Sequence, residues 1–127
     1  MHAVGVEEVA AHVGRPHPLR EQAQSFFERA VSETDALATS AEVLQELVHA
    51  YVPVGRLATL DAALQLAASM GAVWPLELED IVLARSLVPR HGGLGARDLV
   101  HLACCQRRGV RTLHTYDRSL ATAVRGG

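Results

Sequence analysis

Apolar residues recur at helical spacing in several stretches of the chain, and short β-prone runs separate these stretches. The pattern is clearest between residues 94 and 120, where Leu99, Leu102 and Ala103 fall on one face of a predicted helix. Gly109 follows at the position where glycine commonly ends a helix. Residues 110–115 then form a short β-prone run, and a short helix is expected from Arg118.

The rest of the chain divides in the same way. Further helices are expected at residues 19–31, 41–52, 57–70 and 77–88, and Ser40 is suited to cap the second of these. Further strands are expected at the start of residues 2–9, at 35–39 and at 72–76. Because strands alternate with helices, the pattern predicts a parallel α/β sandwich, with residues 1–127 as a single domain.

Composition narrows the classes of protein that fit this pattern. Hydrophobic residues make up 49% of the chain but aromatic residues only 4%, so the core is expected to consist of Leu, Val and Ala. The net charge of -2 argues against a generally basic coat for nucleic acid, although a local groove is compatible with it. No run approaches about 18 apolar residues and no signal peptide opens the chain, so a soluble, cytoplasmic protein without a membrane partner is expected.

The two cysteines, Cys104 and Cys105, are adjacent on the predicted helix. Adjacent helical residues do not easily form an unstrained disulfide, and two neighbouring thiols do not make a zinc site without further ligands. We therefore expect both to be small core or boundary residues in a reducing compartment.

Three acidic residues, Glu46, Asp98 and Asp117, stand at positions where a carboxylate either needs a partner or can bind a cation. Glu46 borders the apolar stripe of its helix, where a charge costs energy unless it is paired, protonated or bound to a cation, or reaches past the boundary to water. Asp98 opens a helix and Asp117 follows a strand. Ligand sites in parallel sheets collect at the carboxyl ends of strands, and carboxylates there suit a hard divalent cation. The alternative to a metal role is structural: Asp98 then only interacts with the helix dipole, and Asp117 only caps the segment after it.

Four short segments in order give the chain a resemblance to a known family. They are GRPHPLR at residues 14–20, VLQE at 43–46, LGARD at 94–98 and TYDR at 115–118. Over nearly its whole length the chain resembles the PIN-domain ribonucleases, and within them the VapC-type toxins of bacterial toxin–antitoxin pairs.

The resemblance implies a fold, an activity and a set of partners. The fold is an α/β, PIN-like three-layer sandwich, with a central, mostly parallel sheet of four to five short strands flanked by helices. The activity is that of an endoribonuclease toxin, in which Mg²⁺ or Mn²⁺ activates a water that cuts an RNA phosphodiester. The implied partners are an RNA substrate, a cognate antitoxin protein and a second copy of the chain in a homodimer.

The same resemblance assigns residues to the site. Glu46, Asp98 and Asp117 fall on the family's second, third and fourth acidic positions and would be the catalytic and metal-binding residues. His101 and Thr115 are adjacent to them and are given supporting roles at most; a histidine at this position is more often a satisfied interfacial residue than a ligand.

The chain departs from the family at the first acidic position. Counting back from Gly14 puts Gly5 where the family has an Asp and Glu7 where it commonly has Asn. One explanation is that Glu7 substitutes as a metal ligand, which requires backbone movement because the two positions are about 6–7 Å apart along a strand. The others are a degenerate relative with weak or lost nuclease activity, and an N-terminus altered by mutation or by a changed reading.

Three functions therefore stay open. The chain is a metal-dependent endoribonuclease toxin, a catalytically degenerate PIN-like module that binds RNA or the antitoxin, or a small α/β scaffold in which the acids are only caps. Arginines near the site either contact RNA phosphates or are solvated surface charges; these are Arg97, Arg107, Arg108, Arg111 and Arg118.

Overall fold

The computed structural model describes residues 2–5, 37–114 and 118–126. The predicted helix at 19–31 lies outside these residues, as do three predicted site residues, Glu7, Thr115 and Asp117. The described strands are β1 (His2–Val4), β2 (Leu37–Ser40), β3 (Ala72–Trp74) and β4 (Leu113–His114). The described helices are α3 (Ala41–Tyr51), α4 (Leu57–Ala68), α5 (Leu78–Leu87), the 3-10 helix η1 (Val88–Arg90), α6 (Ala96–Arg107) and α7 (Arg118–Gly126).

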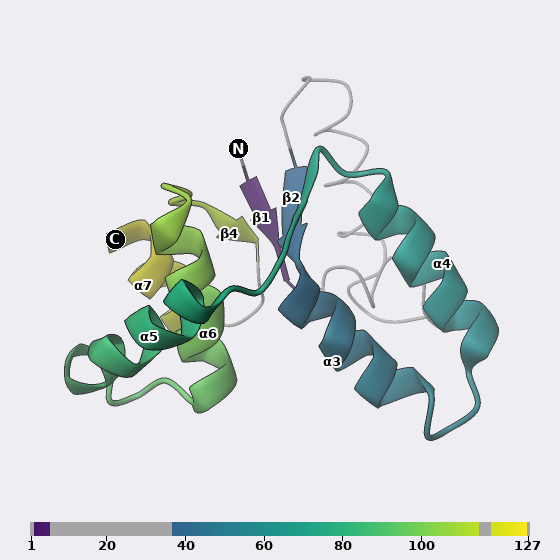
Figure 1. The fold of residues 1–127 in the computed structure, drawn as a ribbon, viewed down its shortest axis with the longest axis horizontal. Coiled ribbons are helices and arrows are strands. Elements are labelled where there is room, and N and C mark those ends of the chain that lie inside the picture. Colours follow the sequence, from purple (N-terminus) through teal and green to yellow (C-terminus); the bar gives the residue numbers. More distant parts are fainter. Residues whose placement is uncertain (1, 6–36, 115–117, 127) are drawn as a thin grey trace.

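The four described strands form one sheet in the order β3-β2-β1-β4, and each neighbouring pair is parallel. Helices α3 and α4 lie on one side of the sheet, and α5, α6 and α7 lie on the other (Figure 1). The predicted three-layer α/β sandwich with a parallel sheet is therefore confirmed.

Alternation along the strands explains the two layers of helices. In register across the sheet, Ala3 pairs with Ala38 and with Leu113, and Ala38 pairs with Ala72; all four pack into the core beneath α5, α6 and α7. Val4 on β1 and Leu37 on β2 are adjacent in sequence to these positions, so their side chains point to the opposite face of the sheet and pack against α3 and α4.

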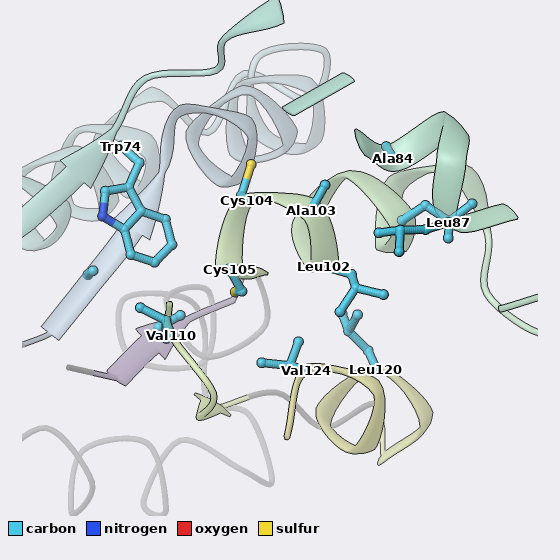
Figure 2. Packing of buried hydrophobic residues seen from close by; sticks show 13 residues of the cluster. Trp74, Ala84, Leu87, Leu102, Ala103, Cys104, Cys105, Val110, Leu120 and Val124 are labelled. Atoms are coloured by element: carbon cyan, nitrogen blue, oxygen red, sulfur yellow. The ribbon is translucent and has the colours of Figure 1, made fainter. Parts of the chain in front are cut away.

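Helix α6 is the central element of the larger core. Its buried side chains include the small residues Ala103, Cys104 and Cys105, which let the helix lie close to the sheet. Leu102 is fully buried and points toward Leu120 and Val124 of α7 (Figure 2). Because α6 carries both Asp98 and His101, this packing fixes the position of the candidate site relative to the sheet.

Several predicted boundaries are confirmed for identifiable reasons. The Ser40 side chain accepts a hydrogen bond from the Val43 N–H at 3.3 Å and caps α3. Gly109 ends α6 with a φ of 68°, a conformation that glycine adopts without strain. A Cβ on Gly71 would lie 3.2 Å from the Leu37 carbonyl oxygen, so the close approach of two backbones favours glycine before β3.

The predicted strand at 110–115 begins too early. Val110 is buried, but its N–H donates to the Cys105 carbonyl oxygen at 2.9 Å and so closes the end of α6 instead of joining the sheet. The described strand starts only at Leu113. The helix predicted at 57–70 also ends earlier, at Ala68, where the Ser69 hydroxyl donates to the Leu66 carbonyl at 2.6 Å.

Across the described ranges, no helix has the length and apolar character needed to cross a membrane.

Candidate functional site

Glu46 and His101 join the two helices that carry the candidate site. Glu46 Oε1 lies 3.1 Å from His101 Nε2, and the two side chains are only 16% and 13% exposed. A carboxylate oxygen accepts, so with hydrogen on Nε2 the imidazole is the donor in this contact. The Glu46 carboxylate therefore reaches from α3 to α6, which lies on the other side of the sheet, and is largely shielded from water.

Asp98 lies one turn before His101 on the same helix. Residues three apart on a helix are neighbours on its surface, so Asp98 shares the face of α6 that His101 turns toward Glu46. Asp98 is half-buried and stands in the first turn of α6, where a negative charge is also favoured by the helix dipole. Asp98 thus stands on the same face of α6 as His101, one turn nearer the start of the helix.

The remaining predicted ligands lie outside the described residues. In the sequence Asp117 immediately precedes α7, and Glu7 stands three residues after the end of β1. Gly5 is described: it follows β1 directly, half-buried, and gives the carboxyl end of this strand no side chain. Next to it, the Val4 carbonyl accepts a hydrogen bond from Thr39 Oγ1 at 2.9 Å.

The donor types of the described site fit a hard cation, but the described residues do not complete a cluster. Within residues 2–5, 37–114 and 118–126, no three His, Cys, Asp or Glu side chains are grouped so as to hold a metal ion. Glu46 and Asp98 supply the carboxylate oxygens that Mg²⁺ and Mn²⁺ prefer. A further acid is needed to complete such a site.

A second group of charges, whose pairing the sequence does not show, lies between α5 and α6. The fully buried Asp80 accepts hydrogen bonds from Arg107 Nη1 at 2.9 Å, from Arg108 Nη1 at 2.7 Å and from the Glu77 N–H at 2.9 Å. Glu77 and Asp80 form the capping box of α5. The spacing of that box is visible in the sequence, but the burial of Asp80 is not.

The electrostatics of this group follow from its contacts. Burial by itself would raise the pKa of Asp80, but hydrogen bonds from Arg108, Arg107 and the Glu77 backbone outweigh it and lower the pKa to about 2. Arg108 also stacks on Trp74, with Cζ 5.2 Å from the ring centroid. Arg108 is therefore held in an ion-pair network and is not a solvated surface charge, whereas Arg107 joins the same network from an exposed position.

The two cysteines are core residues, as predicted. Cys104 and Cys105 are 1% and 2% exposed and are not joined by a disulfide (Figure 2). Burial raises the pKa of Cys104 to about 11 and that of Cys105 to about 12. Both thiols stay protonated at neutral pH and are poor nucleophiles and metal ligands.

Comparison with known proteins gives these features a family context. The model of the PIN domain matches residues 9–125. Ribonuclease VapC23 of Mycobacterium tuberculosis is 57% identical over 113 residues, which cover 89% of this chain and 90% of that protein. Ribonuclease VapC13 of the same organism is 36% identical over 107 residues, 84% of this chain and 82% of the relative.

Solved structures show the same fold at lower identity. The crystal structure of M. tuberculosis VapC20, a sarcin-ricin loop cleaving toxin, superposes with a TM-score of 0.80 at 17% identity, over 97% of this chain and 95% of that one. FitAcB from Neisseria gonorrhoeae superposes with a TM-score of 0.72 at 18% identity, over 98% and 93%. From the family match and the identity to these relatives, the chain belongs to the PIN-domain family and, within it, to the VapC ribonucleases.

Proposed function

We propose that this protein is a metal-dependent endoribonuclease, the toxin of a toxin–antitoxin pair. The observation that carries the proposal is the 3.1 Å contact between Glu46 and His101, because it brings Glu46 against the helix face that bears Asp98. A chain 57% identical to a named VapC ribonuclease is expected to use such a pair of acids in the same reaction.

In this proposal Glu46, Asp98 and Asp117 hold Mg²⁺ or Mn²⁺. When bound, such an ion lowers the pKa of a coordinated water and offsets the negative charge that grows on the phosphoryl oxygens. The chain's own contribution is to hold the carboxylates on two rigid helices, with His101 occupying one oxygen of Glu46. Glu7 is a fourth candidate ligand, in place of the acid that Gly5 lacks.

A cognate antitoxin and a second copy of the chain are the proposed protein partners. For the second copy we propose the apolar face of α5, formed by Leu78, Ile81 and Val82, which are 73%, 44% and 61% exposed. Their spacing puts them on one side of the helix, opposite the buried Asp80, Ala84 and Leu87. Contiguous exposed apolar side chains of this kind commonly mark an interface.

The second candidate function is a PIN-like module that binds RNA or the antitoxin without cutting RNA. Gly5 favours it, because the carboxyl end of β1 presents no acid where the family has an Asp. Loss of one carboxylate weakens a site for a hard cation, since affinity follows the ligand charge.

RNA cleavage with and without Mn²⁺ separates the two functions. The wild-type chain is expected to cut hairpin RNAs only in the presence of the ion, and Asp98→Asn and Glu46→Gln to lose more than about tenfold of the rate. Glu79→Gln, which changes an exposed acid on α5, is the matched control and is expected to cut like the wild type. Cleavage that survives Asp98→Asn refutes the enzyme proposal, and metal-dependent binding of the hairpin without cleavage supports the binding module.

The toxin role is tested in cells. Induction of the wild-type chain is expected to arrest bacterial growth, and co-expression of a small neighbouring gene encoding a DNA-binding protein is expected to relieve the arrest. Arrest by Asp98→Asn at equal protein level contradicts a toxic effect that depends on RNA cleavage.

A further inference from the structure

We infer that His101 is a positioning residue, which fixes the Glu46 carboxylate for a divalent cation by holding one of its two oxygens. This role rests on the proposed metal-dependent function and goes beyond the acids that define it. It concerns a side chain that itself need not touch the ion.

The contact has the geometry that such a role requires. The 3.1 Å separation joins Nε2 to Oε1, and no described residue donates a hydrogen bond to Oε2, which is the oxygen proposed for the ligand. Glutamate has three side-chain torsions, and an unrestrained carboxylate would sample many orientations at a cost in binding entropy. One hydrogen bond from a neighbouring helix removes most of that freedom before a cation arrives.

The surroundings make the restraint effective. Glu46 is flanked by the buried Val43 and Leu47 on α3, and His101 is flanked by the buried Leu102 on α6, so both backbones are fixed by the core. The two side chains are 16% and 13% exposed, and little water competes for their hydrogen bond. A hydrogen bond with low exposure between two rigid helices is stronger and better oriented than one at the surface.

The direction of the hydrogen bond also suits the role. A hydrogen bond donated by the imidazole uses one lone pair of Oε1 and leaves the other lone pairs of the carboxylate for a cation. Donors to metal-ligating carboxylates act in this way in metal sites generally, and their removal costs about 10–100-fold in metal affinity or activity.

Two substitutions of His101 separate positioning from packing. The amide nitrogen of Gln reaches the position of the histidine Nε2, whereas the shorter Asn does not reach Glu46. Titration calorimetry of the full chain with MnCl₂ is expected to give His101→Gln an affinity near that of the wild type. His101→Asn and His101→Leu are expected to bind Mn²⁺ roughly 10–100-fold more weakly. His49→Leu, an exposed histidine of α3, is the matched control and is expected to bind like the wild type.

The outcomes distinguish this role from the function on which it rests. If the wild type binds Mn²⁺, Glu46→Gln and Asp98→Asn abolish binding, and His101→Asn binds as tightly as the wild type, the positioning role is wrong and the metal site stands. If the wild type does not bind Mn²⁺, the metal site itself is refuted, and the role of His101 with it. Since Gln and Asn are both polar and differ by one methylene, their comparison stays decisive even if His101→Leu fails to fold.

Discussion

Arg108 Nη1 lies 2.7 Å from Oδ1 of Asp80, a carboxylate that is fully buried between α5 and α6. The same guanidinium donates to the carbonyl oxygens of Pro75 at 3.0 Å and of Cys104 at 3.1 Å and stacks on Trp74. One side chain thus ties together the end of β3, the start of α5 and the end of α6. Because α6 carries Asp98 and His101, this network also holds the candidate site in position.

Replacing Asp80 with Asn should destabilise the protein at neutral pH. A buried ion pair that loses one partner typically costs roughly 3–5 kcal/mol, and the partial exposure of the two arginines favours the lower end of that range. Urea unfolding at pH 7 measures the loss, and Asp61→Asn, an exposed acid on α4, is expected to leave the free energy of unfolding nearly unchanged.

The Asp80 network also predicts how stability depends on pH. The folded pKa of about 2 is below the ordinary value of 3.8, so ionised Asp80 stabilises the folded state by about 2 kcal/mol above pH 4. This contribution is lost as the pH falls from about 4 to about 2. The difference in unfolding free energy between the wild type and Asp80→Asn should shrink over that interval, and a difference that stays constant would argue against a low pKa for this group.

Arg108 should be less replaceable by lysine than its neighbour. Arg108→Lys loses the planar fork that reaches Asp80, Pro75 and Glu77 and the stack on Trp74, and should cost about 1–3 kcal/mol. Arg107 contacts only Asp80 and Glu77 in the described network, so Arg107→Lys should cost less. Equal losses in urea unfolding would show that the stack and the backbone contacts contribute nothing.

Restoring an acid at position 5 should strengthen metal binding. Gly5 directly follows β1 and is half-buried, so a side chain added there would start at the carboxyl end of that strand. Gly5→Asp is expected to lower the dissociation constant for Mn²⁺ by about tenfold, because affinity for hard cations rises with the number of carboxylate ligands. Titration calorimetry measures this dissociation constant. Gly5→Asn, which adds the same bulk without the charge, is the matched control. An unchanged affinity in Gly5→Asp would mean that position 5 does not face the site, whereas weaker binding by Glu7→Gln would indicate that Glu7 already substitutes.

Charge on the apolar face of α5 should prevent self-association. Val82→Glu puts a carboxylate in the middle of the proposed interface and is expected to give a monomer in sedimentation velocity, where the wild type gives a dimer. Val54→Glu changes an equally exposed valine, 66% exposed between α3 and α4, and is expected to stay dimeric. A wild-type chain that sediments as a monomer, or a dimer that persists in Val82→Glu, would exclude this face.

Local chemistry made much of the fold predictable. Alternating strand and helix patterns gave the parallel sandwich, the Ser40 cap set the start of α3, and Gly109 set the end of α6, because each depends on residues close together in the sequence. The strand at 110–115 was misplaced because β propensity does not show that the Val110 N–H bonds to the helix before it. Tertiary context decided that boundary.

The site was only partly accessible from sequence for a related reason. Helical spacing indicated that Glu46 borders the core, but not which helix it meets, since His101 is 55 residues away. The sequence does not show the partners of Asp80, because the two arginines that pair with it are 27 and 28 residues distant. Spacing gives the side of a helix on which a residue lies, whereas its partner depends on how the helices pack across the sheet.

The most direct test of the account is diffraction from crystals of the wild-type chain soaked in MnCl₂, with the anomalous signal of manganese measured. An anomalous peak is expected between Glu46 and Asp98, with carboxylate oxygens about 2.0–2.3 Å from the ion and His101 still donating to Glu46. The same crystals of Asp98→Asn should lose the peak. A wild-type map without a peak at this position, or a peak that persists unchanged in Asp98→Asn, would contradict the claim that these acids bind the cation.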